Sequence, residues 1–577
     1  MTNQHHDTVI VGAGPAGLQL AYFLEKSGRD YLVVDAGERS GTYFEQYPRH
    51  RKLLSINKQY TGREATDFNL RHDWNCLLTH PGEEMPFKDF STEYFPSADD
   101  LVDYLNAFRE RFDLKVRHGF RVARISKDAD VDQFQLTGAD GEMLTCRRLV
   151  MAVGVSTPNV PDIPGIEHAQ GYDSMSLDPE DYRGKTVLIL GKGNSALETA
   201  EYLMPYASYI HLSSRRPVQF AWDTHFAGNV RSTNATFFDS YLLKSQNAVL
   251  DGPTQQIERT PSGRLRVRWA ATHQDVEEEV EHFEYDHVLH CCGFRLDTSI
   301  FDDSCAQETI IEGRFPAMTG AWESSTTSGL YFAGVLMQAI DYKRSQSSFI
   351  HGFRYNVRTL FHLLENRYEG VDLPGEEVKL TPADIASKVI DRANNCSALW
   401  QMVGFLCDVF VLPTDRSQPG RWYHDLNVRY VAEEFGAKHP ELEFYVSMLT
   451  YGPGPTSKDF PGTAFDHPHV HPHTSERAYG DLTTEIHPVL RRYRGSELQA
   501  EYHVKSDVLT DWDSPYYREP LQEFLDWDLM DGPRPEWAKP RRRDLIRNSA
   551  MRLVDYRATG ELEPDKTTAT TSGKAQL

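Results

Sequence analysis

Two glycine-rich loops of the dinucleotide-binding type occur in this chain of 577 residues. The first, at 12–17, reads GAGPAG, and the second, at 191–196, reads GKGNSA. Each follows a run of β-branched and aliphatic residues and precedes a helical pattern. Each therefore predicts a strand, a tight turn and a helix whose first N–H groups face a pyrophosphate. Two such loops predict two dinucleotides, and hence electron transfer from one cofactor to the other.

The strand after each loop indicates which dinucleotide the loop binds. The run 31–35 ends in Asp35, and a carboxylate there accepts hydrogen bonds from a ribose 2′-hydroxyl, as FAD requires. The run 209–216 ends instead in two serines, Ser213 and Ser214, and two arginines, Arg215 and Arg216, and a guanidinium suits a 2′-phosphate. A solvated basic turn would also explain the arginines. Because the arginines stand one strand after a phosphate loop, they favour NADPH at the second site, whereas Asp35 favours FAD at the first.

Composition and charge narrow the class of protein. The formal net charge of −23 argues against a nucleic-acid partner, because nucleic-acid binding needs many cations. The longest apolar candidate for a membrane span, 402–412, is short and contains Asp408. The N-terminus lacks a charged-then-apolar leader. We expect a soluble, cytoplasmic protein with no nucleic-acid or membrane partner, for which a homo-oligomer remains an open alternative.

The seven cysteines indicate what the flavin does not reduce. Disulfide reductases with two dinucleotides need a thiol pair at short spacing beside the flavin. Here five cysteines are isolated, and Cys291 and Cys292 are direct neighbours in an apolar run. Neighbours on a strand point to opposite faces, so this pair is more typical of packing than of a redox dithiol. Dioxygen becomes the leading electron acceptor.

Beyond the two loops, the chain resembles the flavin monooxygenases with two dinucleotide folds, which include flavin-containing monooxygenases, Baeyer–Villiger enzymes and N-hydroxylases. The stretches that carry the resemblance are SGTYFEQYP (40–48), KLLSINKQYTG (52–62), YFPSADDLVDYLNAFRERF (94–112), MAVGVSTPNVPDIPG (151–165), CCGF (291–294) and GLYFAGV (329–335). The chain departs from the family pattern between the crossover and the second loop, where Ala169 stands for an aromatic residue and Met175 for a histidine.

The resemblance implies the residues of the site. Asn57 takes the position of the asparagine beside the isoalloxazine and is the catalytic candidate. The implied cofactor-binding residues are Gly12, Gly14, Pro15, Ala16, Gly17, Asp35, Thr42, Tyr43, Tyr47, Gly154, Gly191, Gly193, Asn194, Ser195, Ala196, Ser214, Arg215, Gly293, Gly334 and His351.

A resemblance over nearly the whole chain links it to the lumenal FAD-dependent oxidoreductases associated with glycoprotein degradation. It rests on YPRHRKLLSINKQYTG, FNLRHDWN and DYKRSQSSFIHGFRYNVR. Those proteins carry a signal peptide and a retention tail, which we do not find here, so we expect a soluble relative. Bacterial biosynthetic N-hydroxylases, including those acting on aspartate, resemble it in broad layout.

The predicted fold class is α/β, with two Rossmann-like dinucleotide-binding domains, the NADPH domain inserted in the FAD domain, and a C-terminal α-rich domain. The expected limits are 1–165 and 301–370 for FAD, 166–300 for NADPH, 371–560 for the C-terminal domain and 561–577 for a disordered tail. The C-terminal helices are expected at 384–406 and 426–436. The aromatic-rich segment 220–246 is expected to form a wall over the flavin cleft.

Cations crowd the predicted flavin site. Around Asn57 lie Arg49, Arg63 and Arg71, and the segment 341–346 adds Lys343 and Arg344. Arg49, Arg63, Lys343 and Arg344 are the candidate substrate-binding residues, because an arginine fork binds a carboxylate. Holding NADPH phosphates is an equally good explanation. Alternating histidines at 467–473 could hold a metal, but no cysteine or carboxylate has ligand spacing, so no metal is expected.

The resulting hypothesis is a monooxygenase that uses NADPH, FAD and dioxygen. The resemblance implies that a flavin C4a-hydroperoxide oxygenates a heteroatom, most simply by N-hydroxylation of a small amine or amino acid, such as an aspartate-type substrate, in biosynthesis. The alternatives are a reductase or NADPH oxidase acting on a protein or quinone, a Baeyer–Villiger oxygenation of a ketone, and a protein-interaction role for the C-terminal domain.

Overall fold

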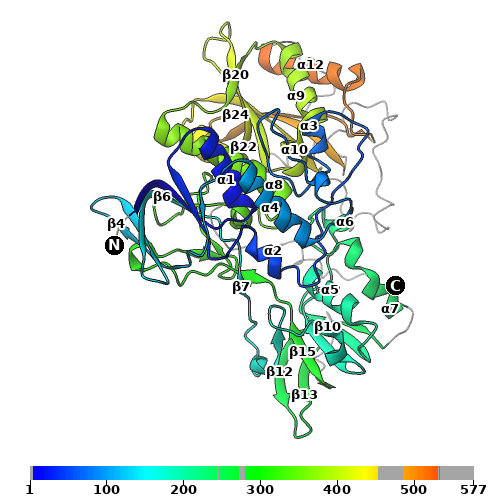
Figure 1. Ribbon diagram of the computed structural model, residues 1–577. Coiled ribbons are helices and arrows are strands. Elements are labelled where there is room, and N and C mark those ends of the chain that lie inside the picture. Colours follow the sequence, from blue (N-terminus) through cyan, green and yellow to red (C-terminus); the bar gives the residue numbers. More distant parts are fainter. Residues whose placement is uncertain are drawn as a thin grey trace, which may run out of the picture.

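The computed structural model describes residues 4–242, 246–271, 280–451, 485–507, 509–530 and 532. Figure 1 shows three bodies stacked along the long axis, each built on a sheet. We call them the N-terminal body in the centre, the middle body below it and the C-terminal body above it. The N-terminal body takes strands from both sides of the middle body in sequence, so the chain leaves it and returns.

The N-terminal body contains a seven-stranded sheet in the order β3-β2-β1-β6-β5-β4, with β19 also paired to β6. Its strands are β1 Gln4–Val11, β2 Tyr31–Val34, β3 Val116–Arg117, β4 Val122–Asp128, β5 Gln133–Gly138, β6 Met143–Met151 and β19 Leu330–Phe332. The first half of β6 pairs antiparallel with β5, and its last three residues pair in parallel with β19. The returning chain therefore completes the sheet beside the first glycine loop.

Helices pack on this sheet, because each presents a continuous apolar side that is buried there. Helix α1 (Pro15–Lys26) begins with proline, whose fixed φ suits the first helical position, and its first ten residues are buried. It packs against α8 (Ile350–Leu364), which is almost wholly buried. The other helices of this body are α2 Thr42–Gln46, α3 Thr66–Asn69 and α4 Ala98–Arg111.

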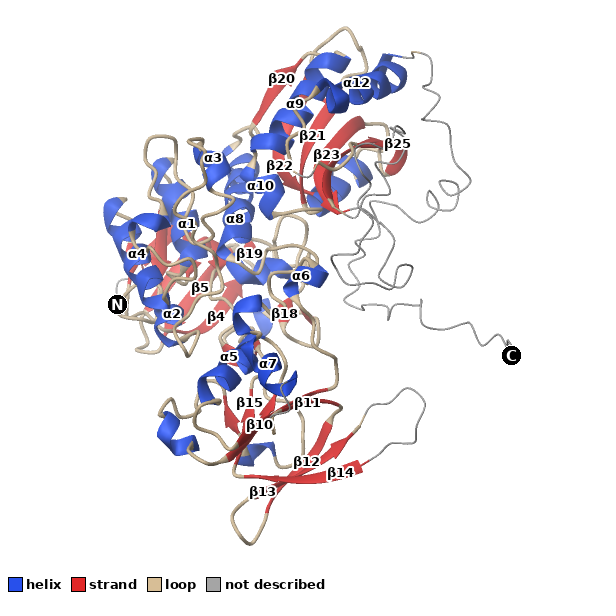
Figure 2. Cartoon of the chain, turned by 90° about the vertical axis from the view of Figure 1, so that its right-hand side faces the viewer, coloured by secondary structure: helices blue, strands red, loops and turns tan. Residues whose placement is uncertain are grey.

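The middle body contains a five-stranded parallel sheet in the order β11-β10-β9-β15-β8. These strands are β8 Gln170–Gly171, β9 Thr186–Leu190, β10 Tyr209–Ser214, β11 Ala248–Asp251 and β15 His287–His290, and the helices are α5 Asn194–Leu203, α6 Ala221–Thr224 and α7 Thr236–Leu242. An antiparallel meander of β12 Thr254–Arg259, β13 Leu265–Ala270 and β14 Val280–Tyr285 projects from it (Figure 2). The chain enters and leaves along a two-stranded ribbon of β7 Thr157–Pro158 and β16 Phe294–Arg295. A further ribbon, β17 Thr309–Ile310 with β18 Phe315–Pro316, follows in the N-terminal body.

The C-terminal body corrects one expectation. Within the described residues it is built on a six-stranded antiparallel sheet in the order β20-β22-β21-β23-β24-β25, so the prediction of an α-rich domain is wrong. The strands are β20 Gly375–Val378, β21 Leu406–Leu412, β22 Gly420–Asn427, β23 Glu443–Tyr451, β24 Ile486–Arg494 and β25 Glu497–His503. The helices are α9 Pro382–Asn395, α10 Ser397–Gln401, α11 Val428–Tyr430 and α12 Pro515–Met530. Most of the run at 402–412 becomes β21, one of the two central strands, because a short, largely apolar run fits a buried strand as well as a helix.

The hydrophobic core differs between the bodies. One continuous cluster of buried side chains runs from β1 through α8 and the C-terminal sheet to α12. The middle body has two separate clusters, the first of which also includes Tyr47 of the N-terminal body. The N-terminal and C-terminal bodies are therefore packed as one unit, to which the middle body is attached. The α/β class and the two dinucleotide folds are confirmed. The expected tail at 561–577 lies outside the described residues.

Candidate active site

The two glycine loops have the same backbone geometry. Gly12 has φ +110°, and a Cβ there would lie 2.5 Å from the carbonyl oxygen of Ala152. Gly191 has φ +132°, and a Cβ there would lie 2.5 Å from the carbonyl oxygen of Cys291. Both positions require glycine because the neighbouring strand runs directly against the loop.

The second glycine of each loop fits a pyrophosphate. No protein atom lies within 4 Å of a Cβ built on Gly14 or on Gly193. These residues are the N-caps of α1 and α5, and neither helix has a side-chain cap, so the first backbone N–H groups face this open space. The open space and the donors meet at one point in each body, and the residues present fit two dinucleotides.

The third small residue of each loop fixes the helix to its strand. A Cβ on Gly17 would lie 1.9 Å from the carbonyl oxygen of Gly12. At the matching position of the second loop, Ala196 is fully buried. Pro15 and Ala16 are buried in the first turn of α1, and a Cβ on Gly334 (φ +76°) would come 2.8 Å from the Cβ of Ala16. At Gly334 the chain that follows strand β19 thus passes directly against the first glycine loop.

The strand ends carry the predicted ribose and phosphate residues. Asp35 follows β2, and its carboxylate accepts hydrogen bonds from the backbone N–H of Ala13 (2.6 Å) and of Gly37 (2.7 Å). Ser214 ends β10, and Arg215 and Arg216 after it are exposed. Lys192, in the second loop, holds this turn: its Nζ donates to the carbonyl oxygens of Ser214 (3.4 Å) and Arg216 (3.5 Å) and pairs with Asp251.

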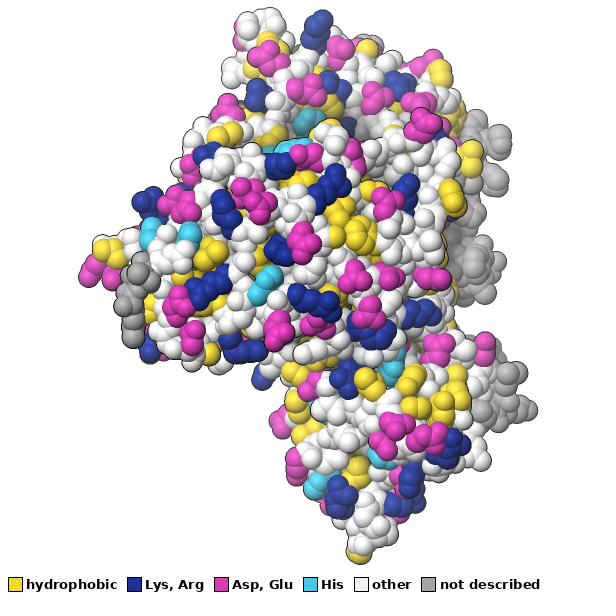
Figure 3. Space-filling model, in the orientation of Figure 1, with side chains coloured by type: hydrophobic (Ala, Val, Ile, Leu, Met, Phe, Trp, Pro, Cys, Tyr) yellow, Lys and Arg dark blue, Asp and Glu magenta, His cyan; other side chains and the backbone are white. Residues whose placement is uncertain are grey.

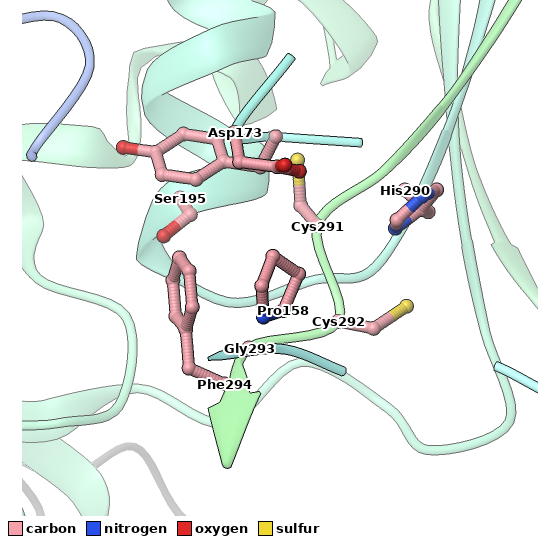
Figure 4. A pocket seen from close by; sticks show the side chains of 9 residues that line it. Pro158, Asp173, Ser195, His290, Cys291, Cys292, Gly293 and Phe294 are labelled. Carbon is pink, nitrogen blue, oxygen red and sulfur yellow. The ribbon is translucent and has the colours of Figure 1, made fainter. Parts of the chain in front are cut away.

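A small cavity of about 10 Å³ lies between α5 and the ribbon that joins the two bodies (Figure 4). It is lined by Pro158, Tyr172, Asp173, Ser195, His290, Cys291, Cys292, Gly293 and Phe294. Burial raises the pKa of the Cys291 thiol and raises that of Cys292 to about 11, so both remain protonated near neutral pH. Cys292 Sγ donates to the carbonyl oxygen of Leu190 (3.6 Å). The strand β15 ends at His290, so Cys291 and Cys292 lie beyond the strand in which they were expected, and the two thiols form no disulfide.

A series of hydrogen bonds joins the N-terminal and middle bodies along their boundary, which we call the seam. The backbone N–H of Arg49 donates to the hydroxyl of Tyr172 (2.8 Å), and that hydroxyl donates to Glu198 on α5. Burial raises the pKa of Glu198 to about 7. Arg49 also donates from Nη2 to the carbonyl oxygen of Met175 (2.8 Å). Two residues singled out in the sequence, Arg49 and Met175, thus join the bodies.

Two predicted residues present unpartnered polar atoms in the interior. Asn57 is 1% exposed, and its amide nitrogen donates to the carbonyl oxygens of Ser91 (2.7 Å) and Glu93 (3.2 Å), which leaves Oδ1 without a partner among the described residues. His351, in the first turn of α8, stacks on Trp74 at 3.9 Å between ring centroids, and neither ring nitrogen has a described partner. Burial holds the pKa of His351 well below its usual value, so the ring is neutral. A flavin edge could accept and supply the missing hydrogen bonds.

The structure adds two arginines that the sequence did not single out. Arg231, from the middle body, lies over Trp74 with its guanidinium 5.2 Å from the ring centroid, and donates to the carbonyl oxygen of Leu54 (2.8 Å). Burial lowers its pKa. Arg354, on α8, is fully buried and holds the loop before Cys76 through the carbonyl oxygens of Leu70, Asp73 and Cys76. No local motif marks either residue, because their contacts come from distant segments.

The cations predicted to bind substrate do not converge. Arg49 serves the seam, and Arg71 is buried against the C-terminal body, where it donates to the carbonyl oxygen of Asn394. Lys343 and Arg344 are exposed on the loop before α8. Arg63 is exposed beside Phe68, with 5.4 Å between its guanidinium and the ring centroid. These residues therefore do not form together the cationic pocket that was expected for an anionic substrate.

The remaining predicted residues lie around the same seam. Tyr43 is 41% exposed and Tyr47 is buried, with 5.0 Å between their ring centroids, and Tyr47 packs on Phe294 at 5.1 Å. Thr42 begins α2 and donates from Oγ1 to the carbonyl oxygen of Arg39 (3.0 Å). Gly154 has φ +66° and Gly293 φ +78°, in the two crossover segments.

Asn194 fixes the wall of the middle body. Its amide donates to the carbonyl oxygens of Gly228 (3.2 Å) and Asn229 (2.8 Å), and its Oδ1 accepts from the backbone N–H of Arg231 (3.0 Å). The expected aromatic wall at 220–246 is helical at α6 and α7 and is anchored here to the second glycine loop.

Surface and metal features are unremarkable in the described part of the chain. Figure 3 shows basic and acidic side chains interspersed over the face that it presents. Among the described residues no group of three metal-ligating side chains occurs, and the histidines at 467–473 lie outside them. Searched over the same residues, the helices include none with both the length and the apolar character to cross a bilayer.

Comparison with known proteins gives consistent matches. Residues 9–334 match the model of a family described as pyridine nucleotide-disulphide oxidoreductase. The chain is 34% identical over 565 residues to FAD-dependent oxidoreductase domain-containing protein 2 of Mus musculus, covering 90% of this chain and 84% of the mouse protein. It is 30% identical over 276 residues to indole-3-pyruvate monooxygenase YUCCA1 of Oryza sativa subsp. japonica, covering 45% of this chain and 62% of the rice protein.

Among solved structures, a flavin-containing monooxygenase from Stenotrophomonas maltophilia is 18% identical to this chain, with a TM-score of 0.47, and the match covers 63% of this chain and 98% of that one.

Proposed function

We propose that this chain, which belongs to the pyridine nucleotide-disulphide oxidoreductase family and uses FAD and NADPH, is a flavin monooxygenase that N-hydroxylates a small amine or amino acid. The overall reaction would consume one amine, one dioxygen, one NADPH and one proton, and would yield a hydroxylamine, NADP⁺ and water. FAD supplies the activation of dioxygen when it is bound and reduced.

The arrangement of the cysteines carries the proposal. All seven are free, and six are buried. The one adjacent pair, Cys291 and Cys292, packs against the ribbon between the bodies. The pKa of each thiol is raised, and the Cys292 thiol donates a hydrogen bond to a backbone carbonyl oxygen. A disulfide reductase needs a reactive thiolate pair that can meet the flavin. The chain offers no such pair, which favours dioxygen as the acceptor.

The interior around Asn57 supports oxygen transfer in a water-poor site. Oδ1 of Asn57 is an acceptor, and neutral His351 offers one N–H donor and one acceptor nitrogen. Trp74 covers the histidine face. These groups would orient the cofactor edge and exclude water, while the amine substrate uses its own lone pair and needs no general base.

Arg231 supports a substrate with a carboxylate. Its guanidinium lies over Trp74, close to His351, and burial strengthens any ion pair that it forms. A bidentate contact to a carboxylate would fix the distance between the amine and the reacting oxygen. Arg63 and Arg344 remain candidates from the sequence for the same role at the surface.

The test is a screen of amines and amino acids for stimulation of NADPH oxidation, with hydroxylamine and hydrogen peroxide both measured. We expect at least one amine to give product in a one-to-one ratio with NADPH. The Arg231→Met variant should lose product while NADPH oxidation continues with peroxide release, whereas Arg63→Ala and Arg344→Ala test the surface candidates in the same assay.

The competing functions have different signatures. An NADPH oxidase would release peroxide at a rate that no amine changes. A reductase would pass electrons to a quinone or a protein disulfide without consuming dioxygen. A Baeyer–Villiger enzyme would respond to ketones and form esters. Any of these results would contradict N-hydroxylation, and the first two would also contradict oxygenation.

A further inference from the structure

The C-terminal body contacts the middle body through a pair of stacked rings. Tyr451, the last residue of β23, stacks on His225 with 4.2 Å between the ring centroids and 23° between the ring planes. His225 directly follows α6, which lies at the end of the middle body nearer the C-terminal sheet (Figures 1 and 2). The backbone of His225 is left-handed (φ +54°), a conformation that a residue other than glycine keeps where its surroundings hold it.

The N-terminal body holds the same turn of the middle body. Gln346, in the loop before α8, donates from Nε2 to the carbonyl oxygen of His225 (3.1 Å) and accepts at Oε1 from the backbone N–H of Ala227 (3.3 Å). Phe226, between them, is buried and meets the ring of Phe349 edge to face, with 6.4 Å between the ring centroids. All three bodies therefore meet at this turn.

The residues after this turn are bonded to the second glycine loop. Asn194, the first residue of α5, donates to the carbonyl oxygens of Gly228 (3.2 Å) and Asn229 (2.8 Å) and accepts from the backbone N–H of Arg231 (3.0 Å). Residues 225–231, which we call the linking segment, thus join the contact of the three bodies to the loop that is predicted to bind the second dinucleotide.

The position of the middle body matters for electron transfer between two dinucleotides. Transfer of a hydride requires the two reacting atoms to be close and aligned, so the bodies that hold them must keep one relative arrangement. The middle body has hydrophobic clusters separate from the shared core, and the ribbon that joins it has two residues in each strand. A body joined in this way is expected to move relative to its neighbour. The contacts of the linking segment, in addition to the seam, limit that movement.

We propose that Tyr451 of the C-terminal body is a positioning residue for hydride transfer, which acts through His225 and the linking segment to hold the second glycine loop in place relative to the flavin-binding body. The step concerned is transfer of one hydride from NADPH to FAD, which oxidises the first and reduces the second and needs no further reactant. The inference depends on FAD and NADPH as the cofactors and is independent of the oxygenated substrate.

The test follows the reduction of bound FAD by NADPH without dioxygen, by stopped-flow absorbance. We expect Tyr451→Ala to slow this step about three- to tenfold, because the lost ring contact lowers the population of the arrangement that reacts. Binding of adenosine 2′,5′-diphosphate, measured by calorimetry, should stay within about twofold of the parent, since the glycine loop itself is intact. Tyr451→Phe keeps the ring and should restore most of the rate.

The same contact can be removed from the middle body. His225→Asn takes away the ring and leaves a residue that tolerates the left-handed backbone. We expect it to slow flavin reduction as Tyr451→Ala does, and the double variant to be no slower than either single variant, because both remove one interaction. Amide hydrogen exchange of the linking segment should become faster in all three proteins, which is a readout independent of turnover.

A matched control removes a tyrosine of the same sheet. Tyr423 packs on Phe435 of its own body, with 5.7 Å between the ring centroids, and Tyr423→Ala should leave flavin reduction unchanged. Flavin absorbance and circular dichroism report intact folding of each variant. Flavin reduction at the parent rate in Tyr451→Ala and in His225→Asn would overturn the proposal. A loss of nucleotide affinity as large as the loss of rate would overturn it too, since the contact would then shape the binding site and not its position.

Discussion

Gly14 and Gly17 lie three residues apart, yet a methyl group would meet different surroundings at each. At Gly14 it would enter open space at the start of α1, whereas at Gly17 it would lie 1.9 Å from a backbone oxygen. We expect Gly14→Ala to fold and to lose FAD, because the methyl group occupies the place of the pyrophosphate. We expect Gly17→Ala to destabilise the fold itself.

Absorbance of bound flavin and circular dichroism separate these outcomes. Gly193→Ala is the matched control, since it makes the same change in the middle body and should spare the flavin while weakening NADPH. A Gly14→Ala protein that retains its yellow colour would contradict the assignment of the first loop.

Arg215 tests the nicotinamide preference. Loss of one charge-assisted contact to the 2′-phosphate should cost about 1.5–3 kcal/mol, or roughly ten- to a hundredfold in KM. Arg215→Ala should therefore raise the KM for NADPH and leave that for NADH nearly unchanged. If the parent enzyme uses both nicotinamides equally, the second site is not specific for the phosphate.

Glu198 gives a prediction for pH. Burial raises its pKa from 4.5 to about 7, so the folded state holds this proton more tightly than the unfolded chain. Consequently the free energy of unfolding falls as pH rises between these two values. Glu198→Gln keeps an acceptor for Tyr172 without the charge, and should be more stable than the parent by about 2–3 kcal/mol at pH 8 and similar at pH 5.

Thermal unfolding of both proteins across this pH range measures the effect. The same pH dependence in Glu198→Gln and in the parent would show that Glu198 titrates normally in the folded protein.

At the residue scale the sequence predicts what is local. The glycines, Asp35 and the arginine turn follow from spacing alone, and the structure gives each loop the expected geometry. Arg231 and Arg354 were not predicted, because they donate hydrogen bonds to carbonyl oxygens, or pack on rings, of segments distant in the sequence. Arg49 was assigned to substrate, and Arg71 was counted among the cations of the site, from charge alone, which does not reveal that a backbone oxygen already engages each guanidinium.

Helix α9 is joined to two strands of the C-terminal sheet by one cation, the half-buried Arg392. Arg392 donates to both oxygens of Asp408 (2.7 and 2.8 Å) on β21 and to Asp425 (2.6 Å) on β22, while Arg358 of α8 reaches the other oxygen of Asp425 (2.8 Å). Burial would raise the pKa of Asp425, but Arg392 and Arg358 hold it below its usual value.

Removal of that cation should be costly. Arg392→Met leaves two buried carboxylates, and we expect the free energy of unfolding to fall by about 3–5 kcal/mol. Lys388→Met, on the same helix over Trp422, should lower the free energy of unfolding by about 1 kcal/mol or less.

Because the pKa of Asp425 is lowered, the stabilisation by the ion pair of Asp425 with Arg392 is lost as pH falls below about 4. Denaturant titrations at pH 7 and pH 3 check both statements, and equal stability of the two variants would contradict them.

At the element scale the β-α-β units were predictable and the C-terminal sheet was not. Apolar runs beside glycine loops define parallel strands, whereas Leu406–Leu412 is buried on both faces, Asp408 included, and shows no period that separates strand from helix. The helical expectation at 384–406 held for α9 and α10, as far as Gln401, but was wrong at 402–406, which lead into β21. The expectation at 426–436 held from Val428 onward.

The shared core makes the N-terminal and C-terminal bodies one folding unit. Side chains of α8, β21 and α12 belong to a single buried cluster. A chain cut after residue 370 should therefore be insoluble or lose its flavin, because the cut exposes that cluster. Excision of the middle body at the ribbon, with a short linker between 158 and 294, should leave a protein that still binds FAD. Soluble expression and flavin content measure both, and a stable yellow protein ending at 370 would contradict the single core.

The two-residue ribbon also gives the molecule a modular character. Between β7 and β16 the whole middle body is inserted with hydrophobic clusters separate from the shared core, and the turn after β10 is the expected determinant of its nicotinamide preference. The middle body is thus an exchangeable cassette. Grafting a relative's nicotinamide domain between these two strands should transfer the cofactor preference of that relative, while the oxidised substrate stays that of the recipient. The graft must keep the middle-body contacts that Arg49 makes with Tyr172 and Met175 and that Gln346 makes with His225 and Ala227.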